Sequence, residues 1–120
     1  MIQNRFSICI PTHRNDFRFF NAVSSALDQN YPKDLFEICI LYNGGATPQD
    51  QRGDQIKVVK EGLGPSAAKN MVLDMGRNDW LILLDSDDAI IPSALSIYND
   101  TINNYPDLVL GLELAAVNII

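Results

Sequence analysis

Residues 80–88 read Trp-Leu-Ile-Leu-Leu-Asp-Ser-Asp-Asp, an apolar run that ends in three carboxylates within four positions. Such a run is typical of a strand covered on both faces, the kind found in parallel α/β sheets. Asp85, Asp87 and Asp88 would repel one another unless water, a cation or a basic ligand offset their charge, and hard divalent cations prefer oxygen ligands. The stretch therefore predicts a buried strand with a metal site for a phosphorylated ligand at its end.

A purely structural role for these acids is also open. Asp and Ser are frequent in turns and at helix N-caps, so either Asp88 or Ser93 could begin the helix expected after Pro92. A short motif is a hypothesis until its surroundings agree with it. The rest of the chain supplies those surroundings.

Length and composition indicate one globular domain. A chain of 120 residues can bury a genuine core. The net charge of −6 argues against a nucleic-acid partner, because such proteins usually carry a basic face. No apolar stretch has the length of a membrane span, and Met1 to Arg5 does not begin a signal peptide, so we expect a cytoplasmic protein. Cys9 and Cys39 lie in apolar runs without zinc or redox spacing, which predicts reduced core thiols.

Periodicity predicts alternating strands and helices. Strands are expected over residues 6–10, 36–42, 56–60, 80–84 and 108–112, and helices over 17–29, 65–75 and 93–104, with Asp16 as the first N-cap and 47–55 as an exposed loop. This order indicates an α/β fold with a parallel sheet flanked by helices. Ligands of such sheets bind beyond the carboxyl ends of the strands, so the loops 11–15, 42–45 and 85–88 are expected at one edge.

Four motifs, read in order, resemble one enzyme family. They are Ser-Ile-Cys-Ile-Pro-Thr-His-Arg (7–14), Glu-Ile-Cys-Ile-Leu-Tyr-Asn-Gly (37–44), Gly-Pro-Ser-Ala-Ala-Lys-Asn (64–70) and Leu-Leu-Asp-Ser-Asp-Asp (83–88). Their order and spacing resemble the nucleotide-sugar-binding half of family 2 glycosyltransferases, over residues 6–112. The resemblance implies a GT-A fold, a Rossmann-like, mostly parallel sheet flanked by helices. Residues 1–120 would form a single donor-binding domain, truncated after the half that carries the D-x-D motif.

The resemblance also implies a reaction and a cofactor. Members of the family transfer a sugar, with inversion, from a nucleoside diphosphate to an acceptor hydroxyl, and a magnesium or manganese ion binds the diphosphate. Asp85 and Asp87 match the D-x-D acids. By this likeness Asp87 contacts the metal, Asp85 lies near the ribose or the metal, Asp88 supports them, and Ser86 belongs to the same binding segment.

The remaining site residues follow from the other motifs. Pro11, Thr12 and His13 match the loop that meets the nucleobase and ribose, and His13 stands where many relatives have Tyr. Arg14 either reaches a phosphate or is a solvated loop residue. Lys69 matches the basic residue that faces the sugar or diphosphate, although an amphipathic helix also carries surface lysines. Gly64 would let the backbone approach the donor.

The end of the second expected strand departs from the family pattern. Relatives commonly have one or two aspartates there that recognise the base, whereas this chain has Tyr42 and Asn43. The amide oxygen of Asn43 can accept a hydrogen bond from a base N–H, and Tyr42 could stack on the base. Neither side chain brings negative charge, so uridine does not carry over as the donor base.

The chemistry of the acceptor is not assigned from the sequence. In relatives the acceptor site and the catalytic carboxylate come later in the chain, and Glu113 matches no motif for that base. The acceptor is therefore open among a saccharide, a lipid-linked molecule and a protein. A second interpretation is a non-catalytic nucleotide-binding or interaction module, whose sheet edge after Leu112 pairs with another copy as a homodimer. A dinucleotide-dependent oxidoreductase is disfavoured, because no G-x-G-x-x-G follows the first strand.

Overall fold

The computed structural model describes residues 2–45 and 47–106, which form a four-stranded parallel sheet in the order β3-β2-β1-β4. The strands are β1 (Phe6–Thr12), β2 (Phe36–Asn43), β3 (Gln55–Val59) and β4 (Trp80–Leu83). The helices are α1 (Phe17–Leu27), the 3-10 turn η1 (Lys33–Leu35), α2 (Pro65–Met75) and α3 (Ala94–Asn104). The predicted α/β fold is confirmed. The strand expected over 108–112 lies outside the described residues.

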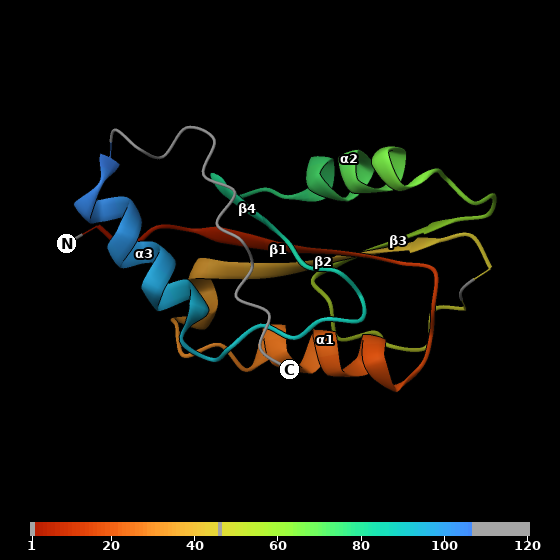
Figure 1. The fold of residues 1–120 in the computed structure, drawn as a ribbon, viewed down its shortest axis with the longest axis horizontal. Helices are drawn as coiled ribbons and strands as arrows, with labels where there is room; N and C mark the ends of the chain where they lie inside the picture. The colour runs from red at the N-terminus through yellow and green to blue at the C-terminus, as the bar shows by residue number, and fades with distance from the viewer. Residues whose placement is uncertain (1, 46, 107–120) are drawn as a thin grey trace.

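The helices cover the sheet on both sides. Figure 1 shows α2 along one face, α1 along the other, and α3 at the end where β1 begins. Asp16 caps α1 as predicted, since its carboxylate accepts hydrogen bonds from the backbone N–H groups of Arg18 and Phe19. Pro65 opens α2 and Gly76 ends it, also as predicted.

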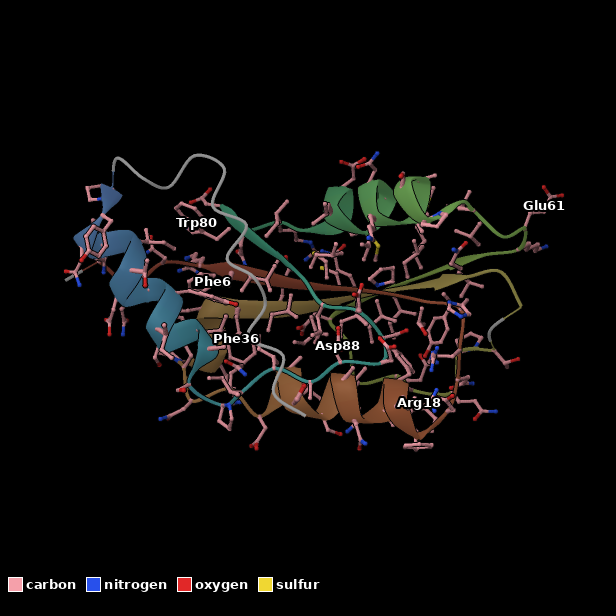
Figure 2. All side chains as sticks on the ribbon, viewed as in Figure 1. Phe6, Arg18, Phe36, Glu61, Trp80 and Asp88 are labelled. Atoms are coloured by element: carbon pink, nitrogen blue, oxygen red, sulfur yellow. The ribbon has the colours of Figure 1, made fainter. Side chains whose placement is uncertain are left out.

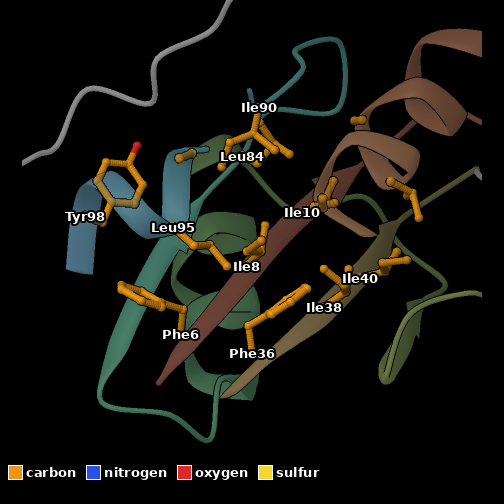
Figure 3. Close-up of a cluster of buried hydrophobic side chains, with 14 of the residues drawn as sticks. Phe6, Ile8, Ile10, Phe36, Ile38, Ile40, Leu84, Ile90, Leu95 and Tyr98 are labelled. Carbon is orange, nitrogen blue, oxygen red and sulfur yellow. The ribbon is translucent and has the colours of Figure 1, made fainter. Parts of the chain in front are cut away.

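The central strands are buried on both faces because their apolar side chains alternate between two cores. The core on the α1 side takes Phe6, Ile8 and Ile10 from β1 and Phe36, Ile38 and Ile40 from β2, together with Leu84, Ile90, Leu95 and Tyr98 (Figure 3). The core under α2 takes Cys9, Cys39 and Leu41 with Ala68 and Val72. The alternation assigns each residue of β1 and β2 to one face by its parity.

The prediction of buried, reduced cysteines is confirmed. Cys9 and Cys39 are free thiols at paired positions of β1 and β2. A hydrogen bond with Cys39, together with burial, raises the pKa of the Cys9 thiol far above its usual range. Because the thiolate is the reactive form, the raised pKa and the full burial of Cys9 both disfavour reaction of its thiol in the folded protein.

A buried carboxylate fastens the sheet to the turn that follows α2. Glu37 accepts hydrogen bonds from the Ser7 hydroxyl at 2.7 Å, the Arg77 backbone N–H at 2.7 Å and the Gln55 side chain at 3.1 Å. Burial raises the pKa of Glu37, but the hydrogen bonds outweigh burial and hold that pKa below its usual value. The ionised form therefore stabilises the fold, and it joins β1, β2, β3 and the α2–β4 turn.

The strand that carries the acids differs from its prediction. Leu81 is 43% exposed, and within residues 2–45 and 47–106 β4 pairs only with β1. Ile82 packs against the core on the α1 side and Leu83 against the core under α2, so both faces of β4 are covered in part, whereas the expected full burial is not met among the described residues. Full burial needs a neighbouring strand and a covering helix on each face, and an apolar run alone does not supply them.

The first strand is longer than predicted, because it continues through Pro11 to Thr12. The Cys9 carbonyl accepts a hydrogen bond from the Leu84 N–H at 2.9 Å, so the backbone polar groups of Cys9 face β4. Pro11, two positions further along β1, has its backbone turned to the same side. The register of β4 ends opposite Cys9, and Pro11 lies beyond it. The missing N–H of Pro11 therefore costs no ladder hydrogen bond.

The loop over 47–55, predicted to be exposed, is partly docked on α1. Asp50 is 6% exposed, and Arg52 binds its carboxylate with Nε–Oδ1 and Nη2–Oδ2 distances of 2.9 and 2.6 Å. Arg52 also donates to the Ser24 hydroxyl and the Phe20 carbonyl of α1. A bidentate guanidinium contact of this kind fixes the loop's position, and polar composition did not reveal it.

Candidate functional site

A cavity of about 520 Å³ lies beyond the carboxyl ends of β1, β2 and β4 and beside the start of α2. Its lining residues are Pro11, Thr12, His13, Arg14, Asn43, Gly62, Leu63, Pro65, Ala68, Lys69, Asp85, Ser86 and Asp87. Segments more than 70 positions apart in the chain thus meet in one place. The predicted convergence of three strand-end loops at one edge of the sheet is confirmed.

The acids form one compact group. One carboxylate oxygen each from Asp85, Asp87 and Asp88 lies within 4.8 Å of the others. Asp85 and Asp87 are exposed, whereas Asp88 is half-buried, at the point where the chain leaves β4 and turns toward α1 (Figure 2). Burial, followed by the charges of Asp87 and Asp85, raises the pKa of the Asp88 carboxyl. A cation among these oxygens would remove that repulsion.

The loop that carries the acids is held at both ends. Before it, the Leu84 N–H donates to the Cys9 carbonyl at 2.9 Å, and within it the Asp88 N–H donates to the Asp85 carbonyl at 3.1 Å. After it, the Ile90 N–H donates to the Ser25 hydroxyl of α1 at 3.1 Å. These contacts present the carboxylates to the cavity without using them as helix caps.

Of the two residues that could begin the helix after Pro92, the structure places Ser93 at its N-cap and not Asp88. Helix α3 begins at Ala94, six positions after Asp88, so Asp88 does not cap it. Ser93 occupies the N-cap position, but in the described part of the chain its side chain makes no capping hydrogen bond. The three carboxylates fit a hard divalent cation in number, chemistry and spacing.

Basic side chains line the other walls of the same cavity. Arg14 and His13 come from the loop after β1, and Lys69 from the first turns of α2. The Arg14 backbone N–H binds the Thr12 hydroxyl at 3.0 Å, and the Arg14 guanidinium lies 3.8 Å from Asp16. The Arg14 Nε is buried and has no hydrogen-bond partner among the described residues. Buried polar atoms without a partner are uncommon in folded proteins.

The wall between β3 and α2 depends on a close backbone approach. Gly44 and Gly45 have φ angles of +59° and +69°, a region that glycine adopts without strain. A Cβ on Gly44 would lie 2.6 Å from both Cα and N of Gly62, which lines the cavity. The Gly44 N–H donates to the Val59 carbonyl at 2.9 Å. The turn after β2 therefore determines how closely the β3–α2 loop approaches the end of β2.

Gly44→Ala should lower the free energy of unfolding by more than Gly45→Ala does. Both substitutions place a Cβ at positive φ, which costs about 1 kcal/mol. Only Gly44 also meets backbone atoms, whereas a Cβ at Gly45 has none of the described atoms within 4 Å. Urea denaturation of the two variants would measure the difference. Equal losses would show that the approach of Gly44 to Gly62 does not constrain the fold.

Most of the predicted site residues line the cavity, and three, Tyr42, Gly64 and Asp88, do not. Tyr42 is wrong as a ligand residue, because it is fully buried on the α1 side, where its ring packs against Phe19 and its hydroxyl donates to the Asp50 carbonyl. Gly64 is the N-cap residue of α2 and is exposed between two lining residues, with open space where a Cβ would stand among the described atoms. It therefore leaves room for a ligand but is not needed for packing. Asp88 lies beside the cavity within the acid cluster.

Several lining residues were not in the predicted set. They are Gly62, Leu63, Pro65 and Ala68. Gly62 and Leu63 follow β3, so the rule that ligands bind beyond the carboxyl ends of parallel strands points to them when it includes β3. The helix residues Pro65 and Ala68 carry no chemical signal in the sequence.

Comparison with known proteins agrees with this arrangement. The family model described as "Glycosyl transferase family 2" matches residues 7–113, which is most of the chain. The chain belongs to glycosyl transferase family 2. The resemblance of its four motifs to this family is thereby confirmed, and the family's named relatives are glycosyltransferases.

Two curated relatives within the family modify poly(ribitol phosphate). The poly(ribitol-phosphate) β-N-acetylglucosaminyltransferase TarP of Staphylococcus aureus is 26% identical over 89% of this chain and 36% of its own length. A poly(ribitol-phosphate) β-glucosyltransferase of Bacillus spizizenii is 26% identical over 95% of this chain and 20% of its own length. The chain thus spans about a third or less of each relative.

Solved structures of S. aureus TarS share the fold. Residues 1–349 of TarS superpose with a TM-score of 0.73 at 20% identity, covering 85% of this chain and 33% of that one. The complex of the same fragment with UDP-GlcNAc gives a TM-score of 0.72 at 21% identity. The GT-A-like architecture of this family 2 chain is therefore established. Among the described residues no helix has the length and apolar character needed to cross a membrane.

Proposed function

We propose that this chain is the donor-binding part of an inverting glycosyltransferase, and that it binds a nucleoside-diphosphate sugar through a divalent cation. One observation carries the proposal: the carboxylates of Asp85 and Asp87 and the cationic side chains of Arg14 and Lys69 line a single cavity at the carboxyl edge of the sheet. A diphosphate bound to a cation needs this arrangement, with anionic ligands for the metal and cationic groups for the phosphate oxygens.

Each group then has a role in the proposed site. Asp85, Asp87 and Asp88 would hold the cation, magnesium or manganese, whose chemical contribution is to offset the charge that develops on the departing diphosphate. Arg14, from the loop after β1, and Lys69, from α2, would bind phosphate oxygens. Helix α2 adds the positive end of its dipole, since its first residues line the cavity.

The loop after β1 is proposed to hold the nucleoside. Pro11, Thr12 and His13 line the cavity, and the buried Thr12 hydroxyl shapes their turn by donating to the Arg14 carbonyl at 2.8 Å. An exposed imidazole such as that of His13 can stack on a base or donate a hydrogen bond to it. UDP is the first nucleotide to examine, because the fold is shared with TarS bound to UDP-GlcNAc.

The transfer step itself needs residues beyond these. Asp85, Asp87 and Asp88 are all assigned to the cation, and no other carboxylate lines the cavity in the described part of the chain. We therefore propose that residues 1–120 provide donor binding, and that the acceptor hydroxyl is activated by a group outside the described residues. The named relatives suggest a polyol-phosphate acceptor as the first candidate.

Thermal unfolding with nucleoside diphosphates tests the proposal. A ligand that binds only the folded state raises stability by RT ln(1 + [L]/Kd), which is about 2.7 kcal/mol at a hundredfold excess over Kd. We expect UDP with manganese to raise the Tm, and UDP or manganese alone to raise it less. ADP and GDP in the same panel report base preference. The absence of any manganese-dependent stabilisation would overturn the proposal and favour an interaction module that lacks the donor site.

A further inference from the structure

The side chain of Asn43 is bonded to the protein backbone at both of its polar atoms. Its Oδ1 accepts a hydrogen bond from the Leu63 N–H at 2.7 Å, and its Nδ2 donates to the Leu63 carbonyl at 3.1 Å. Asn43 is the last residue of β2, and Leu63 belongs to the loop between β3 and α2. The amide thus pairs with a single distant residue across the end of the sheet, as a neighbouring strand would.

This pairing requires an amide in this position. A carboxylate could accept from the Leu63 N–H, but it could not donate to the Leu63 carbonyl, and its second oxygen would face that carbonyl. Tyr42 cannot replace Asn43, because side chains alternate along β2 and Tyr42 points into the α1 core. The Asn43 amide therefore supplies both the acceptor for the Leu63 N–H and the donor for the Leu63 carbonyl.

The loop held by Asn43 forms one wall of the cavity. Gly62 and Leu63 line it, and the chain then enters α2, which supplies Pro65 and Lys69. The loop has a second attachment at its β2 side, where Gly44 lies against Gly62 and donates to the Val59 carbonyl. The position of this wall, and of the start of α2, thus depends on the turn at the end of β2.

We infer that Asn43 is a positioning residue for the donor site, and that it shapes the cavity by holding the Leu63 backbone and does not read the base by direct contact. The inference rests on the proposed function for its ligand, a nucleoside diphosphate. It assigns base discrimination to other groups in the cavity. Asn43 should therefore contribute equally to the binding affinity for every nucleoside diphosphate.

Hydrogen exchange tests the pairing without any ligand. In Asn43→Ala the Leu63 amide loses its acceptor, so its exchange rate in the folded protein should rise by about tenfold or more. Asn43→Asp keeps the acceptor and should protect this amide at least partly. Asn70→Ala is the matched control, because Asn70 is exposed on α2 and is not among the lining residues. Unchanged exchange at Leu63 in Asn43→Ala would overturn the inference.

Nucleotide affinity tests the consequence. We expect Asn43→Asp and Asn43→Ala to weaken manganese-dependent binding of UDP, GDP and ADP by a common factor of about tenfold, the effect of one or two lost hydrogen bonds. Tighter binding of UDP to Asn43→Asp, with GDP unchanged, would instead make position 43 a base reader and overturn the inference. Raised Leu63 exchange with unchanged affinities would also overturn it. If the unmodified protein binds no nucleotide, the proposed function fails, whereas the exchange data still report on the pairing.

Discussion

Replacing Asp87 with alanine should abolish manganese-dependent binding of nucleoside diphosphates in a protein that remains folded. Asp87 is exposed in the turn after β4, so its loss leaves no cavity in the core. It lines the donor cavity and shares the carboxylate cluster with Asp85 and Asp88. We expect affinity in the presence of manganese to fall by at least about 100-fold, since even the outer partners of metal ligands contribute about 10- to 100-fold.

Asp79→Ala is the matched control for this experiment. It removes one exposed carboxylate just before β4, changes the net charge by the same amount, and leaves the lining of the cavity intact. Calorimetric titration of UDP with and without manganese would give both affinities for each variant. If Asp87→Ala bound as tightly as Asp79→Ala and responded equally to manganese, the assignment of the cation to this cluster would be wrong.

Glu37→Ala should be among the most destabilising substitutions in the chain. It removes the acceptor for the Ser7 hydroxyl, the Arg77 N–H and the Gln55 amide, all at the junction of the sheet with the α2–β4 turn. A buried polar group without a partner costs about 1–3 kcal/mol, so we expect the free energy of unfolding to fall by about 3 kcal/mol or more. Urea denaturation at neutral pH measures this loss.

Two further variants separate the causes of this loss. Glu61→Ala removes an exposed glutamate that projects from the loop after β3 (Figure 2), and its free energy of unfolding should stay within about 0.5 kcal/mol of that of the unmodified protein. Glu37→Gln keeps an acceptor oxygen but loses the charge, and it should lie between Glu37→Ala and the unmodified protein. A loss for Glu37→Ala as small as that for Glu61→Ala would contradict the hydrogen-bond network.

The same carboxylate predicts a direction for the pH dependence. The pKa of Glu37 is lower in the folded protein than its ordinary value of 4.5, so the unfolded chain takes up the proton first as the pH falls. The stabilisation by Glu37 is therefore present above about pH 4.5 and is lost as the pH falls through the folded-state pKa. The stability gap between the unmodified protein and Glu37→Gln should close over that range.

Local sequence patterns were sufficient for the element order and for the acidic side of the site. The order of strands and helices follows from apolar spacing. The starts of α1 and α2 and the end of α2 follow from Asp16, Pro65 and Gly76, because capping and φ preferences act over a few residues. The rule that ligands bind beyond the carboxyl ends of parallel strands then placed the acids of 85–88 together with the loop after β1. These inferences need no knowledge of which side chains touch across the fold.

The tertiary structure alone decided between neighbouring residues at the end of β2. Alternation shows that Tyr42 and Asn43 face opposite ways, but which face is closed by α1 and which opens into the cavity depends on how distant helices pack. The same holds for the partner of Asn43, for the close approach of Gly44 to Gly62, and for the burial of Asp50 under Arg52. Each depends on a contact between segments that are distant in the sequence. Local sequence patterns do not show which distant segments meet, because that is decided by how the helices and strands pack.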